Sequence, residues 1–275
     1  ECYIEDAIRG ILKQKNTFLY RLIIGEDYST DGTRDIVKSY ENRYPGKVTV
    51  VYHDSNLGAY KNSEILFELC TSKYVALCDA DDFWIDENKL QKQVEFLESN
   101  KDYSICGHIA RVVEGSRFTN NLIGNYPGQS FTIEDFSKGY KRIPTASLVM
   151  RNSGKLRHPL LREVYGADRA ILFLLSQEGK VKVLDFTGSV YRIHEGGLES
   201  KYRNNQELLA LRNIKENEVF IRYVEVRYRH HLLKKIRWNY FYLFLSSLRR
   251  LSLIEAVSYL PKILKYHLLS ARPQS

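Results

Sequence analysis

The sequence is poor in cysteine and has no cysteine pair at metal-binding spacing. None of its four cysteines forms a C-x-x-C pair, and no histidine lies at zinc-finger spacing. These absences exclude the common structural zinc sites. Cys70, Cys78 and Cys106 lie in or beside apolar stretches, so we expect buried, reduced thiols. Reduced thiols favour a cytoplasmic protein.

Long hydrophobic runs are also absent. No stretch of about 20 uncharged apolar residues occurs, so no segment has the composition of a membrane-spanning helix. Internal repeats and low-complexity segments are missing as well. With 44% hydrophobic and 27% charged residues among 275, the composition is typical of a folded globular protein and argues against disorder.

Basic charge is concentrated at the C-terminal end. Residues 201–275 carry 15 Lys and Arg against 5 Asp and Glu, whereas the first 200 residues have a net charge of −2. A near-neutral body suits a small-molecule site, and a basic, aromatic region suits an anionic surface. Residues 232–269 are compatible with a helix at the inner face of the cell membrane, or with a helical cap whose cations are solvated. No nucleic-acid-binding module accompanies the charge, so we expect no nucleic-acid partner.

Hydrophobic periodicity predicts an α/β protein. The first hundred residues predict strands at 20–25, 48–52 and 73–78, and helices at 1–14, 31–45, 59–70 and 89–99. This alternation indicates βαβ units in a mainly parallel sheet flanked by helices. The later pattern is mixed, with strands expected at 103–113, 147–151, 181–184 and 189–193, a helix at 168–177, and helices from about 204 onward. We therefore expect a catalytic domain over residues 1–200 and a basic helical extension over residues 201–275.

An acidic segment, D-A-D-D, follows the expected strand at 73–78. Asp79, Asp81 and Asp82 repel one another, and no basic residue lies among them to offset the repulsion. A magnesium or manganese ion, bound through one or two of these carboxylates and through substrate phosphates, would offset it. The alternative is an acidic helix start, with the carboxylates stabilising the helix that begins near Asp86.

A second acidic pair, Glu26 and Asp27, follows the expected strand at 20–25. Ligands of parallel sheets bind beyond the carboxyl ends of the strands, where both acidic segments fall. Asp27 is placed there to accept a hydrogen bond from a nucleobase N–H. Ser29 or Asp31 is suited to cap the next helix, whatever the function.

Four motifs in order resemble the family-2 glycosyltransferases. Residues 26–33 are similar to the family's D-D-x-S-x-D-x-T segment, and the Asn56-Leu57-Gly58 run with Asn62 is similar to its N-x-G segment. Residues 78–84, followed by Lys89-Leu90, resemble its D-x-D segment and the helix after it. Residues 191–197 resemble the Y-R-x-H element that closes the catalytic domain in many bacterial members. Four motifs in the right order, over about residues 1–200, are far more specific than any one alone.

The resemblance implies a GT-A fold and a role for each matching residue. Asp27 would contact the uracil of a UDP-sugar, with Asn56 on the same nucleotide-sugar site, and Asp79 would lie near the ribose. Asp81 would bind the Mn²⁺ or Mg²⁺ that bridges the diphosphate, with His194 near the metal or the diphosphate. Asp168 matches the general base of inverting members. Because it begins a helix, its alternative role is to cap the N-terminus of that helix.

The implied activity is an inverting sugar transfer. The donor would be a nucleotide-sugar, most simply a UDP-sugar, and the acceptor a hydroxyl of a cell-surface glycan or lipid-linked precursor. Two alternatives remain at this point. One is a metal-dependent nucleotidyltransferase, although the Gly-rich basic phosphate loop expected of that class is not visible. The other is an inactive, membrane-associated binding protein.

Two departures from the family pattern bear on these expectations. Family members begin with a strand whose end carries Thr-Tyr or Pro-Tyr against the nucleobase, whereas this sequence starts at the helix that should follow it. We therefore expect an N-terminally truncated GT-A domain. Tyr28 also stands where the family has a small residue.

Overall fold

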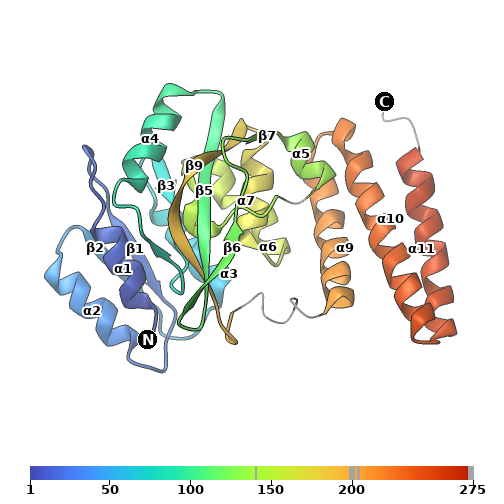
Figure 1. The fold of residues 1–275 in the computed structure, drawn as a ribbon, viewed down its shortest axis with the longest axis horizontal. Coiled ribbons are helices and arrows are strands. Elements are labelled where there is room, and N and C mark those ends of the chain that lie inside the picture. The colour runs from blue at the N-terminus through green and yellow to red at the C-terminus, as the bar shows by residue number, and fades with distance from the viewer. Residues whose placement is uncertain (140, 198–201, 203–204, 272–275) are drawn as a thin grey trace. The chain divides into compact units, whose positions relative to one another are not determined.

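The chain folds into two compact units. The computed structural model describes residues 1–139, 141–197, 202 and 205–271 (Figure 1). The first unit consists of Glu1–Phe131, Lys141–His158 and Leu174–Ile193, and the second of Thr132–Tyr140, Pro159–Phe173 and His194–Ser275. The residues beyond 200 thus share a unit with two earlier segments. The expected division of the chain into a catalytic domain of residues 1–200 and a helical extension of residues 201–275 stays a prediction.

The N-terminal part of the first unit is a small parallel sheet covered by helices. Strands β1 (Leu22–Glu26) and β2 (Val48–Tyr52) pair in parallel, with Leu22 opposite Val48. Helices α1 (Ile4–Leu12) and α2 (Thr33–Arg43) bury their apolar faces against this sheet. The shared core contains Ile4, Ile8, Val37, Tyr40, Val48 and Val50. The buried residues of α1 lie at helical spacing, so the sequence pattern accounts for this core.

The rest of the first unit is built on a seven-stranded sheet. Its order is β3-β8-β5-β9-β4, with β6 beside β5 and β7 beside β9. The strands are β3 (Tyr74–Ala76), β4 (Phe83–Trp84), β5 (Tyr103–Glu114), β6 (Arg117–Ile123), β7 (Ser130–Phe131), β8 (Val149–Arg151) and β9 (Lys180–Ile193). Helices α3 (Ala59–Leu69) and α4 (Lys89–Ser99) and two 3₁₀ turns, Thr145–Ser147 and Gly154–Arg157, complete this unit.

The expected α/β class with flanking helices is confirmed, but strand direction is more mixed than predicted. Parallel pairing joins β1 to β2 and β5 to β9, and the other ladders of the described residues are antiparallel. The reason is local: β6 returns from β5 through a tight turn at Gly115, and β4 and β7 are two-residue strands reached by loops. The turn at Gly115 is too short for the crossover that parallel pairing of β5 and β6 would need.

Strand β9 joins two segments that the sequence pattern separates. Strands were expected at 181–184 and 189–193, but one strand runs from Lys180 to Ile193 beside β5. The pairing register shifts between His108 and Ile109 and again between Ile109 and Ala110. These irregularities absorb the extra residues of β9 as bulges. The strand therefore passes through a segment whose composition resembles a turn.

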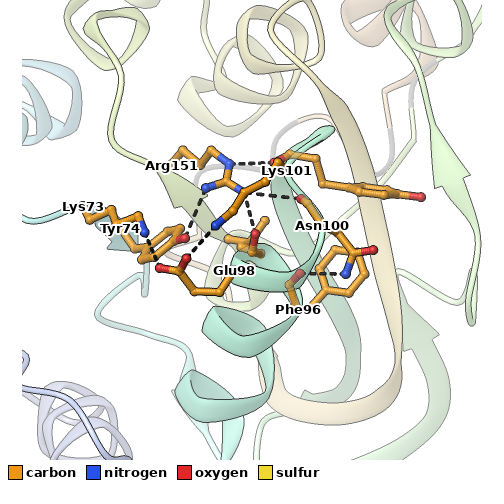
Figure 2. A network of polar contacts seen from close by, with 9 residues as sticks. Lys73, Tyr74, Phe96, Glu98, Asn100, Lys101 and Arg151 are labelled. Atoms are coloured by element: carbon orange, nitrogen blue, oxygen red, sulfur yellow. Dashed lines mark hydrogen bonds and ion pairs between the residues drawn. The ribbon is translucent and has the colours of Figure 1, made fainter.

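Arg151 closes the C-terminal end of α4 (Figure 2). Its Nη2 donates to the carbonyl oxygens of Leu97 at 2.5 Å and Asn100 at 3.3 Å. Its Nε donates to the carbonyl oxygen of Tyr103 at 2.8 Å, and its Nη1 to Tyr74 Oη at 3.1 Å. Carbonyls of a last helical turn have no partner within the helix, so the guanidinium both satisfies them and joins α4 to the sheet.

The second unit is helical in its described residues. Three long helices, α9 (Gln206–Tyr223), α10 (Val226–Arg249) and α11 (Leu253–Ala271), lie side by side around a common core (Figure 1). The shorter helices are α5 (Ile133–Lys138), α6 (Leu160–Glu163) and α7 (Ala167–Leu175), whose last turn belongs to the first unit. Among the described residues, no helix combines the length and the apolar character needed to cross a bilayer.

The four cysteines are free thiols, and of the three that were expected to be buried only Cys106 is. Cys106 is buried, Cys70 and Cys78 are half-buried, and Cys2 is exposed. Burial raises the pKa of Cys106 to about 12, so its thiol stays protonated and packs as a small apolar group.

Candidate functional site

Asp27 ties together the loops that follow β1 and β2. Its two carboxylate oxygens accept hydrogen bonds from the main-chain N–H groups of Leu57, at 2.7 Å, and Gly58, at 2.9 Å. The side chain of Asn56 donates back to the carbonyl oxygen of Asp27 at 3.1 Å. Gly58 has a φ of +82°, a conformation that favours glycine. The structure thus brings Asp27 and Asn56, two predicted nucleotide-sugar residues, into one small cluster.

A buried polar network supports this cluster. Arg34 Nε donates to Oε2 of Glu26 at 2.6 Å, and its Nη2 donates to the carbonyl oxygen of His53 at 2.7 Å. Burial alone would raise the pKa of Glu26, but hydrogen bonds from Ser29 and the Arg34 guanidinium outweigh it and hold that pKa below its usual value. Arg34 is therefore the residue that fixes the end of β1, a role that the sequence pattern does not reveal.

Tyr28 lies above this network. Its φ is +59°, and the Arg34 guanidinium lies 5.7 Å from its ring centroid and 5.5 Å from that of Tyr52. Stacking of a guanidinium on aromatic faces is favourable. The large residue at position 28, where the family has a small one, thus covers Arg34.

Asn62, in α3, also contacts the end of β1. Its Nδ2 donates to the carbonyl oxygen of Gly25 at 3.1 Å, and its Oδ1 lies 3.1 Å from Nε2 of His53. A Cβ on Gly25 would lie 1.9 Å from Asn62 Oδ1, so only glycine fits at position 25. This contact explains physically why an Asn follows the N-x-G run.

The acidic loop at residues 79–82 is a tight turn between β3 and β4. The N–H of Asp82 donates to the carbonyl oxygen of Asp79 at 3.1 Å, which closes the turn. Asp79 is exposed, Asp81 is half-buried and Asp82 is buried. Strand β4, directly after the turn, pairs with β9. The loop therefore presents two carboxylates outward and directs the third into the protein.

Arg192, on β9, holds the loop through two hydrogen bonds and ties it to α1 through a third. Its main-chain N–H donates to Oδ1 of Asp82 at 2.8 Å, and its Nε donates to the carbonyl oxygen of Asp81 at 2.9 Å. Its Nη2 donates to Asp6, in α1, at 3.0 Å. The guanidinium also lies over the rings of Tyr3, at 4.5 Å, and Phe83, at 5.1 Å. Arg192 thus links α1, the acidic loop and β9.

The electrostatics of the loop suit a cation. Burial, with Asp79 nearby, raises the pKa of Asp82 to about 8. Oδ2 of Asp82 is buried and has no hydrogen-bond partner in the described part of the chain. Within those residues no three His, Cys, Asp or Glu side chains form a ready-made metal cage. Carboxylates in this number fit a magnesium or manganese ion that takes its other oxygen ligands from substrate phosphates.

Asp168 lies in the second unit, at the start of α7, as the sequence predicts. A Cβ on Gly166 would lie 2.9 Å from Oδ1 of Asp168 and 3.0 Å from Nη2 of Arg212. The carboxylate and the guanidinium therefore converge beside Gly166, which has room for no side chain. The Arg212 guanidinium also lies over the rings of Tyr165, at 4.7 Å, and Tyr202, at 4.8 Å.

A buried ion network anchors the residue after Asp168. Arg169 pairs with Glu216, and Arg212 Nε donates to Oε1 of the same glutamate at 2.9 Å. All three side chains are buried. Removing one partner from such a set leaves a buried charge without compensation, so the set acts as a unit.

His194 follows directly after β9, at the beginning of the last segment of the second unit. It is half-buried, and its carbonyl oxygen accepts the N–H of Gly197 at 3.2 Å. Along the chain it is two residues from Arg192, which fixes the acidic loop. Its assignment to the metal, like those of Asp27, Asn56, Asp79, Asp81 and Asp168 to their ligands, stays a prediction.

Comparison with known proteins identifies the family. Residues 1–155, more than half of the chain, match the family model described as glycosyl transferase family 2. The glycosyltransferase TuaG of Bacillus subtilis, provisionally assigned to teichuronic acid biosynthesis, is 37% identical over 137 residues, which are 50% of this chain and 52% of TuaG. Three uncharacterized mycobacterial proteins are 29% identical over 222 residues, 77% of this chain and 61% of theirs. The chain thus spans less than two thirds of the length of these relatives.

Two solved structures share the fold. The Staphylococcus aureus TarS fragment 1–349 in complex with UDP-GlcNAc matches 98% of this chain and 88% of its own, with 14% identity and a TM-score of 0.57. The mannosyltransferase PcManGT of Pyrobaculum calidifontis, in complex with GDP-Man and Mn²⁺, matches 98% of this chain and 82% of its own, with 12% identity and a TM-score of 0.53. With the four motifs, the α/β architecture and the family match in agreement, this chain belongs to glycosyltransferase family 2 and has the GT-A fold.

Proposed function

We propose that this protein transfers a sugar from a nucleotide-sugar, a UDP-sugar in the simplest case, to a hydroxyl of a cell-surface glycan or lipid-linked precursor, with inversion at the anomeric carbon. The observation that carries the proposal is the acidic loop, held by Arg192 so that Asp79 and Asp81 lie on its outer side. The provisional assignment of TuaG to teichuronic acid biosynthesis supports a polysaccharide acceptor. We propose a cytoplasmic location, where nucleotide-sugars are made.

The nucleotide would bind to Asp27, Asn56 and Asp79. Both oxygens of Asp27 already accept a main-chain N–H, but each carboxylate oxygen has a second lone pair for the N–H of a pyrimidine base. These two bonds also orient the carboxylate, so the base would meet a rigid acceptor. The complex of TarS with UDP-GlcNAc supports a uridine nucleotide, and that of PcManGT with GDP-Man makes guanosine the comparison to test.

Asp81 and His194 would hold the divalent cation. When bound, Mn²⁺ or Mg²⁺ neutralises charge that grows on the departing diphosphate. The part of the protein is to keep the loop in one shape, which Arg192 does through the carbonyl oxygen of Asp81 and the carboxylate of Asp82. The mannosyltransferase complex with Mn²⁺ supports this assignment.

Asp168 would act as general base. Its carboxylate takes the proton of the acceptor hydroxyl while the hydroxyl oxygen forms a bond to the anomeric carbon and the bond to the nucleoside diphosphate breaks. One such displacement inverts the anomeric centre, as in inverting hydrolases. General base catalysis contributes about 10²–10⁴-fold. The Arg212 guanidinium, which converges with Oδ1 beside Gly166, would orient the carboxylate.

Titration calorimetry with UDP and GDP, each with and without Mn²⁺, tests the donor and the metal together. We expect UDP to bind only with Mn²⁺ and GDP to bind at least about tenfold more weakly, the range that one specific base contact supplies. A panel of nucleotide-sugars should then release UDP and no pyrophosphate, which separates the enzyme from a nucleotidyltransferase. Equal UDP affinity with and without Mn²⁺ would overturn the proposal.

A further inference from the structure

Helix α11 carries an apolar stripe on its exposed side. Its members, spaced by three or four residues, are Leu253, Val257, Leu260, Leu264 and Leu268. Each is between 46% and 65% exposed. The core side of the same helix is a different one, marked by Ala256 and Tyr266, which are buried. The α11 stripe is therefore a second hydrophobic face, which the helix does not need for its own packing.

The turn between α10 and α11 extends this surface. Leu251, in the turn, is 85% exposed, and Ile254, in the first turn of α11, is 91% exposed. Leu251 has a φ of +59°, an unfavourable conformation for a residue with a side chain. The N–H groups of Leu251 and Ser252 are bonded within the turn, to the carbonyl oxygens of Leu248 and Ser247, so the turn is well formed. An ordered turn and the start of α11 thus hold two large apolar side chains in solvent.

The two helices that carry the α11 stripe and its turn are rich in basic residues. Helices α10 and α11 with their turn carry nine basic residues: Arg227, Arg229, Lys234, Lys235, Arg237, Arg249, Arg250, Lys262 and Lys265. The acidic residue of this stretch, Glu255, is paired with Arg250. Lys262 and Lys265 are exposed and alternate with stripe members along α11. The surface therefore combines exposed aliphatic groups with strong positive charge.

Aromatic residues on the exposed side of α10 add to the same character. Trp238 is exposed, lies edge-on to Phe241 at 5.8 Å, and has the Arg237 guanidinium 5.6 Å from its ring. Tryptophan is enriched where one end of a side chain is apolar and the other is wet.

We propose that the α11 stripe docks on the surface of an anionic lipid bilayer, with α11 lying in the interface. The apolar side chains of the stripe would insert into the hydrocarbon region of the bilayer, and the negative headgroups would attract the lysines and arginines. The stripe extends over 16 residues, about 22 Å from its first to its last member, which suits a helix lying flat. A second copy of this chain is a poorer occupant, because two such basic surfaces would repel each other. The proposal does not depend on the donor, the metal or the base.

Flotation of the full chain with vesicles tests this assignment. Wild type should float with phosphatidylcholine vesicles that contain phosphatidylglycerol, and at least about tenfold less with phosphatidylcholine alone or in high salt. Val257→Gln with Leu264→Gln should lower partitioning at least about tenfold, because it removes apolar depth without changing charge. Ser258→Gln, exposed on the same helix outside the stripe, is the matched control and should float as wild type.

Two further measurements complete the test. Lys262→Gln with Lys265→Gln should weaken binding to the anionic vesicles and leave the weak binding to phosphatidylcholine unchanged. Release of UDP from a free donor in solution should be the same in the Val257→Gln, Leu264→Gln variant, which shows that the enzyme is folded. The proposal is overturned if this double variant floats as well as wild type. It is also overturned if wild type is a dimer that the same double variant makes monomeric, since a second copy then covers the stripe.

Discussion

The main-chain N–H of Arg192 and the carboxylate of Asp82 are joined by a 2.8 Å hydrogen bond across 110 positions of sequence. The bond fixes the buried end of the acidic loop, while the Arg192 side chain holds the carbonyl oxygen of Asp81. A loop of three carboxylates resists folding because its charges repel. Its shape in this protein therefore depends on one basic residue contributed from β9.

The outer carboxylates of this loop give the first prediction. Asp81→Asn keeps the size of the side chain and removes its charge, so we expect Mn²⁺-dependent turnover to fall at least about 100-fold. Steady-state release of UDP from a donor measures it. Asp185→Asn, which removes an exposed carboxylate from β9, is the control and should retain activity. Near-normal turnover of Asp81→Asn would contradict the metal assignment.

Arg192 gives the second prediction. Lysine cannot reproduce the planar fork that contacts Asp6 and the carbonyl oxygen of Asp81, so Arg192→Lys should weaken Mn²⁺ affinity in the presence of UDP about 10–100-fold. A metal titration at fixed UDP measures it, and a circular dichroism melt checks that the variant is folded.

Asp6→Asn separates the loop contact from the ion pair with α1. It removes only a pair in which Asp6 is half exposed, worth about 0–1 kcal/mol, and should leave Mn²⁺ affinity within about twofold. If Arg192→Lys binds Mn²⁺ as wild type does, the loop does not need the side chain of Arg192.

Asp168 gives the third prediction. Asp168→Asn should cut turnover about 10²–10⁴-fold, because an amide cannot accept the acceptor proton. The dissociation constant of UDP should stay unchanged, since the base is proposed to contact the acceptor and not the nucleotide. Glu163→Gln, in the same unit but bonded to Arg222 and Tyr223, should retain turnover. A loss of UDP affinity equal to the loss of turnover would show a binding role instead.

Lys89 gives the fourth prediction, on stability against pH. Burial lowers the pKa of this lysine to about 7, although its Nζ lies 3.9 Å from the Trp84 ring. In the unfolded chain the pKa of a lysine is about 10.4. Between about pH 7 and about pH 10.4, unfolding therefore takes up a proton at Lys89. This uptake makes the free energy of unfolding rise with pH over that range. Lys89→Met, similar in volume, should remove that slope.

Urea unfolding at pH 6.5, 8 and 9.5 measures the difference between wild type and Lys89→Met. The gain in the free energy of unfolding from the methionine should be largest at pH 6.5 and shrink toward pH 9.5. Lys61→Met, which replaces an exposed lysine of α3, should show no such trend. A gain that is the same at all three pH values would contradict burial of a titrating ammonium.

Local pattern predicted much of the fold. The bounds of β2 and α4 agree with the prediction residue for residue, because each has its own hydrophobic periodicity. The antiparallel strand β6 was not predicted, since its composition is polar and its strand character comes from pairing with β5. The sequence pattern predicted two strands in place of β9 for the same reason. Asp185 to Gly188 resemble a break, and the strand continues through them only because it pairs with the long strand β5.

The sequence predicted the acidic residues of the candidate site but not the residues that hold them in position. Carboxylates at strand ends stand out in a sequence. Arg192 lies within the Y-R-x-H run, yet its partner Asp6 is 186 positions away, and no local pattern indicates that contact. No local pattern indicates Arg34 either, because its pairing with the buried Glu26 exists only once β1 and α2 have packed.

The Glu216 ion network determines how far this protein can be shortened. Glu216 neutralises Arg169, which stands next to Asp168, and it is itself held by Arg212. A truncation that stops at residue 200 would strand Arg169 without its counter-ion beside the proposed base, whatever becomes of the lipid-docking helix. A shortened enzyme must therefore retain α9, together with α10 and α11, which share its hydrophobic core.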